Sequence, residues 1–377
     1  MDDPRGLALY VHWPFCQSKC AYCDFNSHVV SAVDHQRWRD AYGRELRRIA
    51  KELPDRILTS IFFGGGTPSL MQAKTVALVI DTARALWPAV NDLEVTLEAN
   101  PTSSEARAFQ GFRDAGVNRV SVGLQALNDA DLKALGRLHS ASEGLSAYEM
   151  ARGIFDRCSF DLIYARQNQS LNAWDTELDQ ALALKPDHLS LYQLTIEAGT
   201  AFGDRFDRGL LRGLPGDDLA SDMFDLTQVR CEAAGLPAYE TSNHARPGAE
   251  SKHNLTYWRS GDWVGIGPGA HGRFTIGDRR IATEGHTMPL TWLLAAEQGS
   301  GERDRAATDA NDLEERLLMG LRLSEGIAVP KSAISQEKMI YINSLTDSNL
   351  LTWDRDHLKL TREGRPLLNS VLRELLA

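Results

Sequence analysis

Three of the five cysteines, Cys16, Cys20 and Cys23, lie within eight positions of one another in the stretch YVHWPFCQSKCAYCDF. Three thiolates spaced C-x3-C-x2-C on one loop can bind three irons of a [4Fe–4S] cluster. The fourth iron would then be open to a small molecule. A structural zinc ion is the competing interpretation, because His12 or His28 would supply the fourth ligand that zinc requires.

The composition limits the setting in which these cysteines work. Of 377 residues, 43% are hydrophobic and 24% are charged, which is ordinary for a soluble globular protein. Lys and Arg number 41 against 51 Asp and Glu, so the net charge of −10 argues against a nucleic-acid partner. We see no apolar run long enough for a transmembrane segment, and the acidic start is unlike a signal peptide. We expect a cytoplasmic location, where clustered cysteines favour metal or redox chemistry over disulfides.

Short apolar runs alternate with longer amphipathic stretches, such as residues 33–53 and 74–86, through the first half of the chain. We expect buried strands at residues 7–12, 59–63, 93–98, 118–123, 160–164 and 188–194. The alternation predicts a parallel sheet, and six repeats favour a partial or full barrel over an open doubly wound sheet, which stays an alternative. Polar or glycine-rich residues end nearly every strand, and in a barrel these loops meet at the active face.

The pattern changes twice along the chain. We predict a barrel core at residues 1–200, a second region at 201–310 and a C-terminal unit at 311–377. The last unit ends in a short hairpin, LLTWDRDHLKLT, and a helix, an order that resembles a winged helix. It holds nine Lys or Arg against ten Asp or Glu, so it lacks the basic footprint of a DNA reader. We expect a structural cap.

The whole cysteine stretch resembles a known family. It is similar to the radical S-adenosylmethionine (SAM) family of the oxygen-independent coproporphyrinogen III oxidase, and is closest to the heme chaperone (HemW) branch. The resemblance implies an α/β fold, a radical SAM partial (β/α)6 barrel with a smaller, mainly helical, winged-helix-like C-terminal domain. It also implies that the open iron binds SAM and that the reduced cluster cleaves it to a 5′-deoxyadenosyl radical. Tyr22 would shield the cluster from water.

The same resemblance assigns further positions to SAM. Gly65, Gly66 and Thr67, in FFGGGTPSL, follow a strand where glycines let the backbone approach a ligand closely. Arg137, in LGRLHS, would pair with the SAM carboxylate through its planar guanidinium. Taken singly, such residues also fit a salt bridge or a helix cap. The other positions that the resemblance assigns to SAM are Tyr10, Glu98, Gln125 and Asp161.

One loop departs from the family pattern. After DLIY the family has Gly/Ala-Leu-Pro-Gly-Gln-Thr, whereas residues 165–170 of this chain read ARQNQS. The Pro-Gly turn is missing, so we expect this loop to take a different shape. Asp161, on the strand before this loop, is intact.

A second distinctive stretch, ESKHNLTYWRSGDWVGIGPGAHGR, covers residues 250–273. Its GPGAHG matches G-x-G-x-x-G, but the proline and the extra glycines favour a loop over a dinucleotide site. HNLTYW matches the HNxxYW motif that marks the heme chaperone branch, in which the histidine is associated with heme. The resemblance therefore implies a heme site at His253, Asn254, Tyr257 and Trp258. The residues alone also allow His253 and Asn254 simply to fix the loop by hydrogen bonds.

Two features separate carrier from enzyme within this family. The oxidases resemble C-x3-C-x2-C-x-C, whereas the last position here is Phe25, and only nine residues precede Tyr10 where the oxidases carry an extension over the substrate. We expect a heme chaperone that binds heme, a [4Fe–4S] cluster and SAM, and delivers heme to apo-hemoproteins, in the family those of the respiratory chain. The alternative is an oxygen-independent coproporphyrinogen III oxidase. The resemblance also admits a homodimer and transient membrane association.

Overall fold

The structure is a computed structural model that describes residues 5–309 and 312–376. Its main element is a sheet of eleven strands in the order β13-β12-β11-β10-β1-β4-β5-β6-β7-β8-β9. The six central strands run parallel to one another, as expected of βα repeats. They are β1 (Gly6–Trp13), β4 (Ile57–Gly65), β5 (Ala89–Ala99), β6 (Arg119–Gln125), β7 (Arg157–Tyr164) and β8 (His188–Gln193). Each coincides with a strand expected from the sequence, which confirms the partial barrel.

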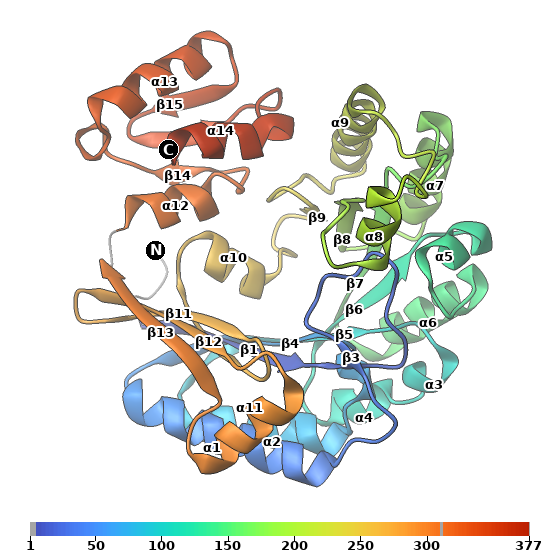
Figure 1. Ribbon diagram of the computed structural model, residues 1–377, viewed down its shortest axis with the longest axis vertical. Coiled ribbons are helices and arrows are strands. Elements are labelled where there is room, and N and C mark those ends of the chain that lie inside the picture. Colours follow the sequence, from blue (N-terminus) through green and yellow to red (C-terminus); the bar gives the residue numbers. More distant parts are fainter. Residues whose placement is uncertain (1–4, 310–311, 377) are drawn as a thin grey trace.

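Helices cover the convex side of this curved sheet, as Figure 1 shows for α1, α2, α4, α6 and α7. In α1, Trp38, Tyr42, Leu46 and Ile49 recur at helical spacing and are buried, while the Asp34 side chain caps the helix by accepting from the Arg37 N–H. The helices as far as the middle of the chain are α1 (His35–Glu52), α2 (Ala73–Leu86), α3 (Ser103–Ala106), α4 (Phe109–Asp114), α5 (Asp129–Leu135), α6 (Ala141–Ile154), α7 (Leu171–Ala183), α8 (Ala201–Asp207) and α9 (Asp217–Ala233), with a 3-10 turn at Pro68–Leu70.

The sheet extends beyond the six central strands at both edges. β9 (Asn243–Ala245) pairs antiparallel with β8, and β10 (Asp262–Ile266) pairs parallel with β1. Three antiparallel strands follow β10, with one helix among them: β11 (His271–Ile276), β12 (Arg279–Gly285), α11 (Pro289–Gln298) and β13 (Glu302–Asp309). The sequence patterns did not predict this extension. The first four residues of GPGAHG form the expected loop between β10 and β11, while His271 and Gly272 begin β11.

One short helix, α10 (Lys252–Trp258), carries the HNLTYW motif and lies on the concave side of the sheet (Figure 1). It sits between β10 and β4 on one side and the C-terminal unit on the other. The concave side of a partial barrel is also where the strand-end residues gather. The motif therefore lies over the same face as the predicted cluster and SAM residues.

The chain ends in a small unit with its own hydrophobic core. A three-stranded sheet in the order β14-β16-β15 packs with three helices. The elements are α12 (Leu313–Gly320), β14 (Ile327–Ala328), α13 (Gln336–Asp347), β15 (Leu351–Asp354), β16 (His357–Leu360) and α14 (Leu368–Leu375), with 3-10 turns at Lys331–Ala333 and Arg365–Leu367. The hairpin and final helix are where the sequence placed them. The domain limits stay a prediction, and residues 1–4, 310–311 and 377 lie outside the described residues.

Within the described part of the chain, no helix combines the length and the apolar character needed to cross a membrane.

Candidate functional site

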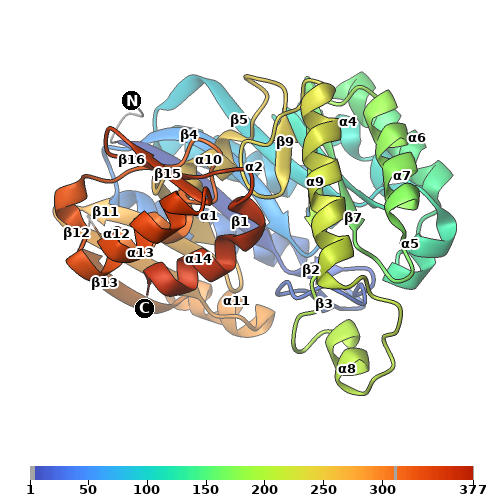
Figure 2. The same cartoon turned by 90° about the horizontal axis from the view of Figure 1, so that it is seen from above.

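The three clustered cysteines occupy one compact loop that follows β1. Cys16 ends β2 (Phe15–Cys16), which pairs with β3 (His28–Val29), and the loop between these strands carries Cys20 and Cys23. The Cys23 N–H donates to the Cys20 carbonyl at 3.3 Å, and all three cysteines are partly exposed. Figure 2 shows this loop beside α8, where the Phe202 N–H donates to the Ala21 carbonyl at 2.8 Å. The loop is therefore held at both ends and along its length.

Two donors from other strand ends reach the cysteine sulfurs. Thr67 Oγ1 donates to Cys16 Sγ, and Arg137 Nη1 donates to Cys20 Sγ, both at 3.3 Å. Burial raises the pKa of Cys16 and of Cys23, and the Thr67 hydroxyl opposes the rise at Cys16. Donors aimed at sulfur stabilise the thiolate form that binds iron.

The other two cysteines have a different environment. Burial raises the pKa of Cys158 and of Cys231 to about 12, so both thiols stay protonated within the core. Both are therefore packing residues. This burial also makes Cys231 a matched control for tests on the loop cysteines.

Both histidines considered as a fourth zinc ligand make hydrogen bonds through their rings, His28 through Nε2 to Asn26 Oδ1 at 3.0 Å. His12 Nδ1 shares a hydrogen bond with the Tyr10 hydroxyl at 3.0 Å, and His12 Nε2 shares one with the Asn26 carbonyl at 2.9 Å. In residues 5–309 and 312–376, no three His, Cys, Asp or Glu side chains are placed to hold one metal ion. A [4Fe–4S] cluster differs from a single ion, because each thiolate binds its own iron.

The glycine stretch after β4 lies directly against the cysteine loop. Gly65 has φ +110°, and a Cβ there would be 2.6 Å from the His12 ring. A Cβ on Gly66 would be 2.9 Å from the Phe15 carbonyl oxygen and 3.0 Å from Cys16 Sγ. The two backbones therefore meet only because these residues lack side chains. Thr67 is buried beside them.

Two acidic side chains, Glu98 on β5 and Asp161 on β7, lie close enough for their charges to interact. Burial, with Asp161 nearby, raises the pKa of Glu98 to about 8. Burial also raises the pKa of Asp161, which accepts from the Ser121 hydroxyl at 3.1 Å. Because their pKa values are raised, the two neighbouring carboxyls resist ionisation. Such a pair is suited to accept hydrogen bonds from a cationic or hydroxyl-bearing ligand.

Arg137 is the centre of the polar network on this face. Its Nη2 donates to Asn100 Oδ1 at 2.8 Å and to the Gly123 carbonyl at 2.9 Å, while Nε is buried and has no partner among the described residues. Gln125 ends β6 with φ 70°, a left-handed conformation. An orphaned donor beside a cysteine sulfur fits a ligand with a carboxylate, as SAM has. Asn100 also donates to Thr67, a role that sequence reasoning missed although it lies in the EANP stretch.

Tyr22 lies between the cysteine loop and Arg137. It packs partly buried against a small apolar cluster that includes Phe202, and its hydroxyl is near Arg137 and Cys20. Burial raises the pKa of Tyr22, so the phenol stays protonated. This position is compatible with the expected shielding of the cysteine loop.

His253 of α10 points into the sheet, toward β1 and β4. Its Nδ1 shares a hydrogen bond with the Ser60 hydroxyl at 3.0 Å, and its backbone N–H donates to Glu94 at 3.2 Å. Its ring stacks on Phe62 at 5.0 Å and lies 6.2 Å from the Tyr10 ring, between centroids. Burial lowers the pKa of His253 to about 4, so the imidazole is neutral at pH 7. Neutral imidazole is the form that binds iron.

The other predicted heme residues of the motif are partly buried on α10. The Tyr257 ring is 6.1 Å from the His253 ring and 4.6 Å from that of Trp258. Asn254 Nδ2 donates to the Tyr239 hydroxyl at 3.4 Å. The structure thus joins the predicted SAM and heme residues at one point, where Tyr10 faces His253, and turns Trp258 toward the C-terminal unit.

The loop at residues 165–170, which follows β7, turns without the Pro-Gly pair of the family pattern. Ala165 and Asn168 both adopt positive φ, at 58°. Arg166 is buried and forms ion pairs with Asp131 at 2.7 Å and Glu177 at 2.5 Å. A buried charge network therefore fixes this loop next to the strand that carries the predicted SAM residue of β7.

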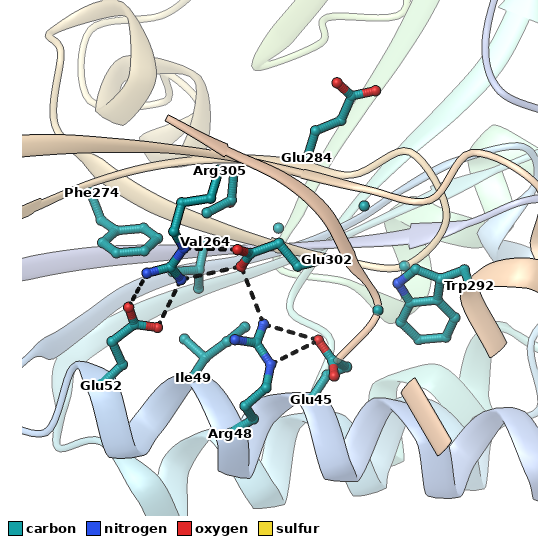
Figure 3. A pocket seen from close by; sticks show the side chains of 15 residues that line it. Glu45, Arg48, Ile49, Glu52, Val264, Phe274, Glu284, Trp292, Glu302 and Arg305 are labelled. Carbon is teal, nitrogen blue, oxygen red and sulfur yellow. Dashed lines mark hydrogen bonds and ion pairs between the residues drawn. The ribbon is translucent and has the colours of Figure 1, made fainter. Parts of the chain in front are cut away.

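A separate pocket lies on the convex side, between α1 and the antiparallel extension (Figure 3). It encloses about 360 Å³, including space open to solvent, and Trp292 lines one side. Two ion pairs join α1 to β13 across it: Arg48 pairs with Glu302 at 3.7 Å, and Arg305 pairs with Glu52. Its lining includes none of the residues predicted for the cluster, SAM or heme.

Comparisons with known proteins agree with this geometry. The family model of the Radical SAM superfamily matches residues 10–178. The chain is 38% identical to "Radical S-adenosyl methionine domain-containing protein 1, mitochondrial" of Danio rerio, over 98% of this chain and 86% of that protein. It is 38% identical to "Heme chaperone HemW" of Escherichia coli (strain K12), over 98% of each chain.

A solved structure shares the fold over nearly the whole chain. The radical SAM enzyme coproporphyrinogen III oxidase (HemN) from Escherichia coli superimposes with a TM-score of 0.81 at 22% identity, over 99% of this chain and 91% of that one. The likeness extends the fold assignment to the C-terminal unit. Taken with the sequence relatives, it shows that this chain belongs to the radical SAM superfamily, in the family of the heme chaperone HemW and radical S-adenosyl methionine domain-containing protein 1.

Proposed function

We propose that this protein is a cytoplasmic heme chaperone that holds a [4Fe–4S] cluster, SAM and heme on the concave face of its partial barrel. It would deliver heme to apo-hemoproteins, and delivery to the respiratory chain would bring it transiently to a membrane. The observation that carries the proposal is the contact between α10 and the barrel, in which His253 faces Tyr10 at 6.2 Å. The SAM site and the heme site would then share one face of the sheet.

In this proposal Cys16, Cys20 and Cys23 hold the cluster. When bound, a cluster with one open iron chelates SAM and supplies an electron to it. Arg137 orients the SAM carboxylate through its orphaned Nε, and the glycines after β4 let the ligand approach the backbone. Glu98 holds its proton near neutral pH until a cationic ligand displaces it.

The heme part of the proposal rests on His253 and its neighbours. The Ser60 hydroxyl occupies Nδ1 and fixes the ring, and among the described residues Nε2 makes no hydrogen bond. A neutral imidazole with one nitrogen fixed and the other free is the usual arrangement of an axial iron ligand. Because His253 is buried, heme entry requires the end of α10 to move away from the sheet.

A heme titration tests this assignment. We expect His253→Gln to lose most of the Soret absorption change that wild type gives with hemin. The control is His244→Gln, which changes another fully buried histidine, on β9. Equal titration curves for wild type and His253→Gln would refute the axial role, and equal losses in both variants would indicate general damage.

The cluster is tested separately. Cys20→Ser should abolish the broad iron–sulfur absorption after anaerobic reconstitution, whereas Cys231→Ser should retain it, because the Cys231 thiol is buried in the core. An unchanged spectrum in Cys20→Ser would overturn the cluster assignment.

The enzymatic alternative is tested by turnover. Reconstituted protein, reductant, SAM and coproporphyrinogen III would be incubated without oxygen, and the porphyrins separated by chromatography. We expect no decarboxylated product from protein whose cluster is intact. The position after the cysteine motif supports this expectation, because Phe25 is 57% exposed where the oxidases would have a further cysteine. Decarboxylated product would establish the oxidase instead.

A further inference from the structure

The C-terminal unit is fixed to the region around α10 by a short segment that follows α12. The Ser324 N–H donates to the Tyr239 carbonyl at 2.9 Å, and Ser324 Oγ donates to the Ala238 carbonyl at 2.5 Å. Arg259, directly after α10, pairs with Glu325 at 2.7 Å. This segment therefore has a defined position against the end of the HNLTYW helix, as the placement of α10 and α12 in Figure 1 also shows.

One cation in that segment, Arg322, lacks a counter-ion. Its guanidinium carbon lies 5.4 Å from the centre of the Trp258 ring, and among the described residues it forms no ion pair and no hydrogen bond. Burial lowers the pKa of Arg322, and Glu240 only partly offsets this. Glu240 is itself engaged, because it accepts from the Asn243 side chain and the Ser242 N–H, and burial raises its pKa.

The ring beneath Arg322 also has an unused donor. Trp258 Nε1 is buried and has no acceptor in the part of the chain that the structure describes. Buried donors are almost always paired, so the unpaired indole N–H points to a missing acceptor, and the partly buried guanidinium of Arg322 beside it favours an acceptor with negative charge. A carboxylate meets both needs, because it carries negative charge for the guanidinium and several lone pairs for both donors.

We propose that Arg322 and the indole N–H of Trp258 form a carboxylate subsite that binds a propionate of heme. The inference rests on the proposed heme function and deepens it, because it makes the C-terminal unit part of the ligand site. His253 and Trp258 are five residues apart on α10, about 7.5 Å along the helix axis and about 140° around it, so a heme bound at His253 would reach Trp258 around the C-terminal end of the helix.

Paired titrations of the full-length protein test the subsite. Hemin and hemin dimethyl ester differ only in the charge and hydrogen-bonding capacity of the propionates. We expect Arg322→Gln to weaken hemin binding roughly tenfold, or about 1.4 kcal/mol, and to leave ester binding within about twofold. Trp258→Phe keeps an aromatic ring beneath Arg322 and removes the N–H, so it should weaken hemin binding by a smaller factor and leave ester binding within about twofold. Arg373→Gln, an exposed arginine of the same unit, is the control and should change neither.

Each other outcome has a definite meaning. Equal losses for hemin and its ester in Arg322→Gln would show that Arg322 acts by packing, which overturns the subsite. Unchanged hemin affinity in both variants would overturn it as well. If the wild-type protein bound neither porphyrin, the heme proposal itself would fail, and the subsite with it. Wild-type binding of both porphyrins with equal affinity would leave the chaperone proposal standing and reject the subsite alone.

Discussion

At the scale of single residues, the most perturbed acid on the concave face is Glu98. Its carboxyl lies at the end of a buried strand beside Asp161, and the two effects together raise the pKa of Glu98 to about 8. An unfolded chain would ionise the same group near pH 4.3. Between these values the native state holds a proton that the unfolded state has lost, so this residue reduces stability as pH rises.

We therefore predict that Glu98→Gln stabilises the ligand-free protein at pH 8.5 and has almost no effect at pH 4. The gain should grow through the range between about 4.3 and 8 and then level off, and we expect about 1–2 kcal/mol, allowing for partial exposure of the side chain. Urea unfolding at a series of pH values measures it. Glu149→Gln, on an exposed helix face, should show no such trend. A gain that is constant with pH would contradict the raised pKa.

At the scale of elements, α10 is a helix of seven residues, too short to be stable by itself. Its N-cap, Ser251, holds it in place: Ser251 Oγ accepts from the Asn254 N–H at 3.3 Å and donates to Glu94 at 3.4 Å. The position of His253 thus depends on one fully buried hydroxyl.

Ser251→Ala should cost about 1 kcal/mol of stability and weaken heme binding several-fold, because the N-terminal turn of α10 loosens. Ser335→Ala provides the comparison, since Ser335 caps α13 in the same way through the Lys338 N–H. We expect a similar loss in urea unfolding from both variants but a change in hemin titration from the first alone. Normal heme binding by Ser251→Ala would mean that the barrel positions α10 without its cap.

The loop at residues 165–170 is a second element that one charge fixes. Replacing the buried arginine, Arg166→Met, would leave Glu177 and Asp131 without their cation, and we expect a loss of about 3 kcal/mol. The control pair, Arg113 with Asp156, is exposed, so Arg113→Met should cost less than about 1 kcal/mol. Urea unfolding compares the two, and equal costs would contradict the importance of burial.

The same scale shows what the sequence can predict. Six buried strands were found because continuous apolar runs between amphipathic helices have few other interpretations. β13 was not found, because Glu302–Asp309 is polar and largely exposed and shows no hydrophobic alternation. The grouping of Cys16, Cys20 and Cys23 on one loop is predictable from local spacing. The contact between Tyr10 and His253 is not predictable from the sequence, because it depends on the pairing of β10 with β1, two strands far apart in the sequence.

At the scale of the whole molecule, the described chain has two substantial hydrophobic cores, one in the barrel and one in the C-terminal unit. They are joined by the short segment around Ser324 and by polar contacts such as that between Arg259 and Glu325. Contacts of this kind are weaker than a shared core, so the two parts should open separately. This matters for the proposed function, because the cysteine loop belongs to the first part and Arg322 to the second.

We predict that Leu358→Ala, in the C-terminal core, destabilises that unit by about 2–5 kcal/mol, because it leaves a cavity at a fully buried site. Amide hydrogen exchange should quicken within residues 312–376 and stay slow in the barrel strands. The iron–sulfur spectrum after reconstitution should be unchanged, while hemin binding weakens because the segment that holds α10 becomes mobile. Leu189→Ala, equally buried in β8, should instead quicken exchange in the barrel. Faster exchange in both parts from either variant would show that the chain unfolds as one unit, and that heme and cluster sites cannot be separated by mutation.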